Sequence, residues 1–326
     1  GISYVFNMLS SLYVSARRSA EDAGFGMKLF AMSTVLNTGL NYLLIFGKCG
    51  LPALGIQGAA VATLLARITE FAVCSFCAVR SRLLPIQWRA FFRPGWEMLR
   101  RFVKYSSPVV LNETAWGLGN SMLTVILGYT DNSVEMLAAN AVMGNLNRLF
   151  LVVCFGLGAA TAVIIGKSIG EGRSHQEVMD LSRTLLVFTA LVGAGLTALS
   201  LLLVPTLFVP VVFPLFKLYG ESAAIATALA VTGFLSIPLH AYSISAVTGV
   251  LRAGGDVFWS TLLDVGPQWC MALPLTALLA LVLKADYWWI AAAIQSESLL
   301  KVPLCALRIR TGQWIHDVTV RKERGQ

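Results

Sequence analysis

Long apolar segments alternate with short polar connections along this chain. An α-helix rises about 1.5 Å per residue, so about 20 apolar residues cross the hydrocarbon core of a bilayer. The pattern predicts helical spans, the first of them a remnant, at 1–16, 29–46, 54–79, 105–129, 134–165, 181–213, 223–251, 257–283 and 287–307. Because a helix satisfies its own backbone hydrogen bonds in lipid, we expect an all-α polytopic membrane protein.

One predicted span, 105–129, carries an ionisable residue far from its ends. Counted from Lys104, Glu113 lies about 13 Å deep in a core about 30 Å thick. Trp116 and Asn120 follow Glu113 at helical spacing and share its face. A carboxylate inside a span is costly and normally faces a cavity or a partner. Glu113 is therefore the first candidate for a functional residue.

Polar residues recur at helical spacing in other spans as well. Asn37 belongs to a stripe in which hydrogen bonds between helices are the simpler explanation. Asn140 and Asn147 form a second stripe, directly before Arg148. Arg148 lies about 21 Å from the outer end of its span, near the depth of Glu113. An ion pair between these two residues is the structural alternative to an exchanging carboxylate.

Further titratable residues lie inside the later spans. His240 is near mid-depth, where it either packs through hydrogen bonds or relays protons. Asp264 and Gln268 are one helical turn apart. We expect Pro267 and Pro274 to break their helix and to free carbonyl groups for coordination.

Two oppositely charged pairs have the spacing of neighbours on one helix face. Arg67 and Glu70 are three residues apart, and Glu297 and Lys301 are four apart. We expect structural ion pairs at both places. The prolines at the end of 181–213 predict a kinked or unwound helix end.

Composition agrees with the span pattern, since 56% of residues are hydrophobic, only 13% are charged and the mean hydropathy is +0.72. The net charge of +8 could indicate nucleic acid. However, most of the 25 Lys and Arg fall on one side when the connections alternate across a membrane. That bias is typical of the cytoplasmic side, where we also place the C-terminus. No basic surface is left for nucleic acid.

Two short motifs resemble parts of known sites but lack the other residues that those sites require. Cys74 and Cys77 form a CxxC without a second pair, inside an apolar helix, so packing is the simpler explanation. Residues 166–168 resemble the end of a phosphate loop, but Thr161 stands where its first glycine should be. Neither HExxH nor GxSxG occurs. We expect no enzyme activity, no bound metal and no cofactor.

Internal similarity indicates two parallel repeats. Residues 18–22 resemble 252–256, and residues 58–62 resemble 290–294, at nearly the same offset. Such repeats are common in transporters. When the start of the second repeat is shifted by this offset, the start of the first repeat falls before residue 1. We therefore expect about three helices ahead of residue 1.

Several stretches together resemble the multidrug and toxic compound extrusion (MATE) family of transporters. They are 35–37, 43–47, 55–63, 108–113, 137–141, 166–170, 250–256 and 308–314. The resemblance implies two lobes of six helices around a central cavity, with about three N-terminal helices lacking here. It implies the end of the N-lobe, a cytoplasmic basic linker, the C-lobe and a cytoplasmic tail at 1–80, 81–104, 105–307 and 308–326.

The resemblance also implies cation-coupled export of organic, often cationic, compounds by alternating access. Glu113 matches the acidic residue of the seventh family helix, and we expect it to be desolvated. An Asp that some relatives carry on the tenth helix is absent, and His240 or Asp264 could substitute. The coupling ion is therefore either H⁺ or Na⁺. The candidate cavity residues are Asn112, Trp116, Asn120, Asn140, Asn147, Arg148, Asn37 and Gln268.

Two other functions stay open at this point. A flippase for lipid-linked saccharides would carry more cationic residues in its cavity, where Arg148 is the only clear one. A receptor or scaffold that transports nothing would have its intramembrane charges neutralised in pairs. For the transporter we expect a small organic substrate, a monomer, contact with the bilayer, no nucleic acid and a place in the cytoplasmic membrane.

Overall fold

The structure is a computed structural model. It describes residues 3–316 except 21, 49, 51 and 82–94. The described residues are helical, and no strand occurs among them. Most of the predicted linker and the end of the predicted tail lie outside the described residues. The chain divides into two compact units, Gly1–Leu99 and Arg100–Gln326.

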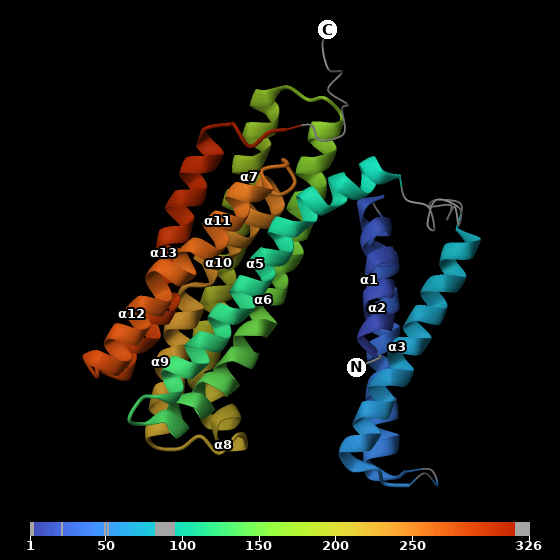
Figure 1. Cartoon of the computed structure of the whole chain (residues 1–326). Coiled ribbons are helices and arrows are strands. Elements are labelled where there is room, and N and C mark those ends of the chain that lie inside the picture. The colour runs from blue at the N-terminus through green and yellow to red at the C-terminus, as the bar shows by residue number, and fades with distance from the viewer. Residues whose placement is uncertain (1–2, 21, 49, 51, 82–94, 317–326) are drawn as a thin grey trace. The chain divides into compact units, whose positions relative to one another are not determined.

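Three complete helices lie among the described residues of the first unit, and they are drawn in blue in Figure 1. They are α1 (Ser3–Ser19), α2 (Ala23–Phe46) and α3 (Gly55–Arg80). Small residues line the buried side of α3, and a Cβ atom on Gly58 would lie 2.5 Å from the Leu44 carbonyl oxygen. In lipid, such small residues allow helices to approach closely, and packing replaces the hydrophobic effect as the driving force.

The turn between α1 and α2 is held by a charged pair. Asp22 caps α2 by accepting a hydrogen bond from the Phe25 amide, and Arg17 Nε donates to Asp22 Oδ2 at 2.9 Å. The Arg17 guanidinium also lies over the Phe25 ring, 4.4 Å from its centroid. The hydrogen bond from Arg17 lowers the pKa of Asp22 below its ordinary value.

The second unit is a larger helical bundle (Figure 1). Its first helix, α5, begins within the last residues of the first unit. Its long helices are α5 (Trp96–Gly128), α6 (Ser133–Gly170), α7 (His175–Leu203), α9 (Glu221–Leu235) and α13 (Tyr287–Arg310). Shorter α-helical pieces are α8 (Phe213–Leu215), α10 (Ile237–Ile244), α11 (Val257–Pro267) and α12 (Leu273–Ala277). Four π-helical segments join them: η1 (Val204–Val212), η2 (Ser245–Leu251), η3 (Gln268–Ala272) and η4 (Leu278–Val282).

Prolines mark several departures from regular helix. The kinked or unwound helix end predicted for 181–213 occurs instead as a continuous π-helical segment, η1, which contains Pro205 and Pro210. The predicted break at Pro267 and Pro274 is wrong, because the chain stays helical and η3 and η4 follow these prolines as wider turns. A proline lacks the N–H that the regular hydrogen-bond pattern requires, and a wider turn absorbs this loss.

The predicted span at 223–251 corresponds to a bent pair of helices that is long and apolar enough to cross a membrane. Helices α9 and α10 meet at Ser236 with a bend of 47°. Ser236 Oγ donates to the Gly233 carbonyl oxygen at 2.7 Å, and Pro238 stands in the first turn of α10. The serine hydroxyl competes for the backbone carbonyl while the proline contributes no donor, and both effects favour a bend at this position.

Six helices or helix runs of the described chain are long and apolar enough to cross a membrane, and the bent pair brings the number to seven. This agrees with the prediction of a multi-pass membrane protein. Helix α5 is not among the six, contrary to our expectation for 105–129. Its polar residues, which include Glu113 and Asn120, lower its mean hydropathy.

The start of the predicted tail packs onto the second unit. The Arg308 guanidinium lies 2.8 Å from Asp256 Oδ2, and the His316 amide donates to the Gly254 carbonyl oxygen. Trp314 is fully buried, and its indole N–H donates to the Ile309 carbonyl oxygen. These contacts join the end of α13 to the turn before α11.

Candidate functional site

A cluster of charged side chains lies inside the second unit, between α10, α11 and α13. We call Asp264, Glu297, Lys301 and His240 the interior cluster. Lys301 Nζ lies 3.0 Å from Asp264 Oδ1, and only 7% of the Lys301 side chain is exposed. Asn112 of α5 donates its amide to the second oxygen of Asp264 at 2.9 Å. A buried charge is costly unless it is paired, and this geometry pairs both ions.

Glu297 is the second buried carboxylate of the interior cluster, with 13% of its side chain exposed. It stands one helical turn before Lys301 on α13, and its Oε1 lies 3.9 Å from the ammonium group. The predicted pair of Glu297 and Lys301 is thus confirmed. However, Asp264 is the closer partner of the lysine, so this pair belongs to a larger network.

His240 completes the interior cluster from α10. Its Nδ1 lies 3.1 Å from the Ser236 carbonyl oxygen and 3.1 Å from Ser298 Oγ. Nε2 lies 3.4 Å from the same Ser298 hydroxyl and 3.7 Å from Glu297 Oε1. A carbonyl oxygen only accepts, so when the neutral ring carries its proton on Nδ1, the electron pair of Nε2 faces Ser298 and Glu297. Protonation at Nε2 would create an ion pair with Glu297.

Arg252 connects the interior cluster to Glu113. Its Nη1 donates to Glu113 Oε1 at 3.4 Å, and its Nη2 lies 3.8 Å from Asp264 Oδ2. Nη2 and Nε of Arg252 are buried without a hydrogen-bond partner among the described residues. The guanidinium therefore lies between two carboxylates, and two of its nitrogen atoms have no hydrogen-bond acceptor among the described residues.

Two expectations for Glu113 need correction. Its side chain is 61% exposed, so it is not desolvated in this structure. The ion-pair alternative named the wrong partner, because Glu113 contacts Arg252, while Arg148 lies exposed on α6 without a recorded ion pair in the described chain. Asn112 points to Asp264, and the next residue along a helix is turned by about 100°, which directs Glu113 away from the interior.

The other predicted cavity residues are dispersed. Trp116 is exposed, and Asn120 donates to the Trp116 carbonyl oxygen of its own helix. Gln268 is buried against Gly119, and Asn147 lies against Gly233.

Asn140 is half-buried on α6. Asn37 lies in the first unit, where it accepts a hydrogen bond from Asn41 at 3.1 Å. The structure thus unites Asp264, His240, Asn112 and Glu113 of the predicted set, the last through Arg252.

Sequence reasoning missed the roles of Arg252, Glu297 and Lys301. Arg252 was recognised only as part of a repeat, and the other two only as a local pair. A usable signal existed, because Glu297 and Lys301 are two charges inside a predicted span, where ionisable residues are rare.

The described residues contain no group of three or more His, Cys, Asp or Glu that could hold a metal ion. The described cysteines, Cys74 and Cys77 among them, are free. The predicted pair of Arg67 and Glu70 is confirmed at 2.5 Å, with Glu70 fully buried.

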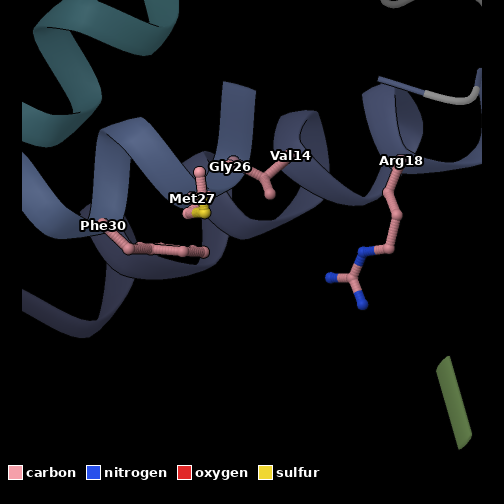
Figure 2. Close-up of a pocket in the computed structure, with 5 residues that line it drawn as sticks. All are labelled: Val14, Arg18, Gly26, Met27 and Phe30. Carbon is pink, nitrogen blue, oxygen red and sulfur yellow. The ribbon is translucent and has the colours of Figure 1, made fainter. Parts of the chain in front are cut away.

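Two hollows occur away from the interior cluster. One of about 170 Å³ lies in the first unit between α1 and α2. Figure 2 shows its apolar side chains, Val14, Met27 and Phe30, with the Arg18 guanidinium extending away from them. The other, of about 280 Å³, lies at the α5–α6 turn and the starts of α9 and α13. Neither hollow is lined by a member of the interior cluster.

Comparison with known proteins identifies relatives of this chain. No family model matches it. The probable multidrug resistance protein YoeA of Bacillus subtilis is 25% identical over 284 residues, which cover 84% of this chain and 58% of YoeA. The multidrug resistance protein MdtK of Pectobacterium atrosepticum is 27% identical over 269 residues, which cover 78% of this chain and 54% of MdtK. The chain thus spans little more than half the length of these relatives.

The fold agrees with the sequence relatives. A crystal structure of a MATE protein in the bent conformation matches with a TM-score of 0.76 at 17% identity, covering 96% of this chain and 67% of that chain. These relatives belong to a family of transporters and not of enzymes, as predicted. The predicted resemblance is thereby confirmed, since the chain is similar in sequence to multidrug resistance proteins and shares the all-helical fold of the MATE structure.

Proposed function

We propose that this chain forms part of a cation-coupled antiporter that exports organic, mainly cationic, compounds across the cytoplasmic membrane by alternating access. The observation that carries the proposal is the interior cluster, in which Asp264, Glu297, Lys301 and His240 are brought together inside a bundle with the fold of a transporter family. Ionisable groups inside a membrane bundle are costly and typically mark ion pathways or relays.

The cluster can couple an ion to a conformational change because its charges are interdependent. Adding a proton or cation next to Asp264 or Glu297 weakens the hold of that carboxylate on Lys301. The pairing between α11 and α13 then changes, and these helices pack on one another in the bundle. Through such a shift, ion binding on one side of the membrane would favour the conformation that is open to the other side.

Glu113 supports the substrate side of the proposal. Its carboxylate is exposed on α5 and Trp116 is exposed on the same helix. A carboxylate and an aromatic face together attract organic cations. Arg252 links Glu113 to Asp264, which gives substrate binding a direct electrostatic route to the interior cluster. The proposal includes a monomer with a cytoplasmic C-terminus, H⁺ or Na⁺ as the coupling ion, and no other cofactor.

Efflux from liposomes tests this function. The protein, reconstituted at its native length, should move a fluorescent organic cation when a proton or sodium gradient drives the coupling ion in the opposite direction. Glu113→Gln and Asp264→Asn should each lower coupled efflux about tenfold or more, within the usual range of coupling between sites. Asp131→Asn is the matched control, because Asp131 is an exposed carboxylate paired with Lys284 outside the cluster.

The rival functions appear as distinct results. Transfer of a lipid-linked saccharide between leaflets without efflux of the organic cation would support the flippase. Unchanged efflux in both carboxylate variants, with the proteins folded, would remove the interior cluster from the mechanism. No transport of either substrate would favour a receptor or scaffold, for which paired intramembrane charges such as Asp264 and Lys301 are expected.

A further inference from the structure

Lys301 places its ammonium group between two buried carboxylates. Its ammonium group lies 3.0 Å from Asp264 Oδ1 and 3.9 Å from Glu297 Oε1. The side chain comes from α13 and is almost completely buried. A metal cation requires several oxygen ligands directed at one point, and here a covalently attached cation already holds that point.

Two basic side chains, Lys301 and Arg252, face the two buried carboxylates. Arg252, at the end of η2, lies 3.8 Å from Asp264, and its nearer partner is the exposed carboxylate of Glu113 on α5, at 3.4 Å. Lys301 and a guanidinium that is shared with Glu113 therefore compensate the two buried carboxylates. A sodium ion entering the cluster would add a positive charge next to both basic groups, and in a bundle of low dielectric this repulsion is strong.

A proton meets a different situation, because it needs only one electron pair. His240 offers Nε2, which faces Glu297 at 3.7 Å, while its Nδ1 contacts the Ser236 carbonyl oxygen. The charged groups near His240 are Glu297 and Lys301 of α13, with Asp264 of α11 beyond the lysine. Among the described residues, His240 forms no ion pair with a group of α6, α7, α9 or η2, the other elements packed against α10.

We propose that Lys301 is a tethered counter-cation that excludes sodium from the interior cluster, so that the site couples to protons. This inference rests on the proposed export function. In the proton step, hydronium from one side gives its proton to Nε2 of His240, an N–H bond forms and a water molecule remains. The imidazolium pairs with Glu297 and weakens the hold of that carboxylate on Lys301, so the pairing of Lys301 with Asp264 changes. On the other side the proton returns to water.

Sodium-dependent stability tests this inference on the protein in detergent micelles. Thermal unfolding is compared in sodium chloride and in N-methyl-D-glucamine chloride at equal ionic strength. The wild type should unfold at the same temperature in both salts. Lys301→Gln removes the tethered cation and leaves both carboxylates, so it should gain a stabilisation that depends on sodium. Lys284→Gln is the control, because this exposed lysine pairs with the exposed Asp131.

Two results would overturn the inference. One is a sodium-dependent stabilisation of the wild type that disappears in Asp264→Asn. The other is a folded Lys301→Gln protein that does not respond to sodium. If Lys301→Gln does not fold, binding of radioactive sodium to the wild type decides. Saturable binding would contradict the tethered cation, whereas its absence, with proton uptake that is lost in His240→Asn, would support it.

The export function and the sodium exclusion fail in different ways. Efflux driven by a sodium gradient would leave the export function standing and overturn the role of Lys301. Absence of all efflux would overturn the export function, while the sodium measurements would still decide whether Lys301 excludes the ion.

Discussion

Single residues decide the local geometry of the second unit. Gly254 has no room for a side chain, because a Cβ atom there would lie 2.3 Å from a ring carbon of Trp314 and 2.7 Å from its carbonyl oxygen. Asn112 and Glu113 are neighbours in sequence, yet one is buried at Asp264 and the other is exposed. A helix rotation of about 100° per residue explains why depth alone could not predict which of them joins the interior.

The contact at Gly254 gives a stability prediction. Gly254→Ala should destabilise the protein by about 1–3 kcal/mol, the usual cost of overpacking a tight site, because Trp314 must move. Gly117→Ala is the matched control, since no atom lies within 4 Å of a Cβ atom there and alanine favours helix. Thermal unfolding in detergent measures both. Equal unfolding temperatures for the two variants would contradict the close contact.

At the scale of elements, the apolar pattern predicted where helices occur more reliably than whether a helix is bent or locally widened. The last span, expected at 287–307, is α13 (Tyr287–Arg310). The bend at Ser236 and the wider turns after Pro267 and Pro274 were not predicted as they occur. Hydrophobic periodicity does not report how a helix compensates for a missing N–H, because the neighbouring helices decide between a bend and a wider turn.

The turn between α1 and α2 should respond to acid. Arg17 lowers the pKa of Asp22 below its ordinary value of 3.8. The stabilising pair is therefore complete above that ordinary value and is lost as the pH falls through the lower pKa of the folded state. Hydrogen exchange at the Phe25 amide, which Asp22 caps, should accelerate in this acidic range relative to other helix starts. Asp22→Asn should remove the acid dependence, and an unchanged pH profile in this variant would contradict the assignment.

At the scale of the whole molecule, the fold class followed from composition and span pattern, and the resemblance supplied its architecture. The interior cluster was predicted only in part. Its members come from three helices and are joined by contacts such as that between Asp264 and Lys301, 37 residues apart. A single sequence gives the depth of each charge, but the choice of partner depends on which helix faces lie together. For this reason Glu297 and Lys301 were interpreted as a local pair.

The division into two units leads to a prediction about independence. All members of the interior cluster, together with Arg252 and Glu113, lie in the second unit. A protein of residues 96–326 should therefore unfold cooperatively and, like the whole protein, unfold at the same temperature in sodium chloride and in N-methyl-D-glucamine chloride. Calorimetry in detergent compares the two. An aggregated fragment, or one without a cooperative transition, would show that this unit needs the rest of the chain.

The buried Trp314 has a practical consequence for anyone who attaches a reporter protein. The indole ring packs against Gly254, and the contacts of Arg308 with Asp256 and of His316 with Gly254 hold residues 308–316 in place on either side of Trp314. A fluorescent protein joined directly after Thr311 would remove Trp314 and expose the turn before α11. The same reporter joined after residue 326 leaves residues 308–316 intact. The site of fusion, and not only its presence, should therefore decide whether a tagged protein survives extraction from the membrane.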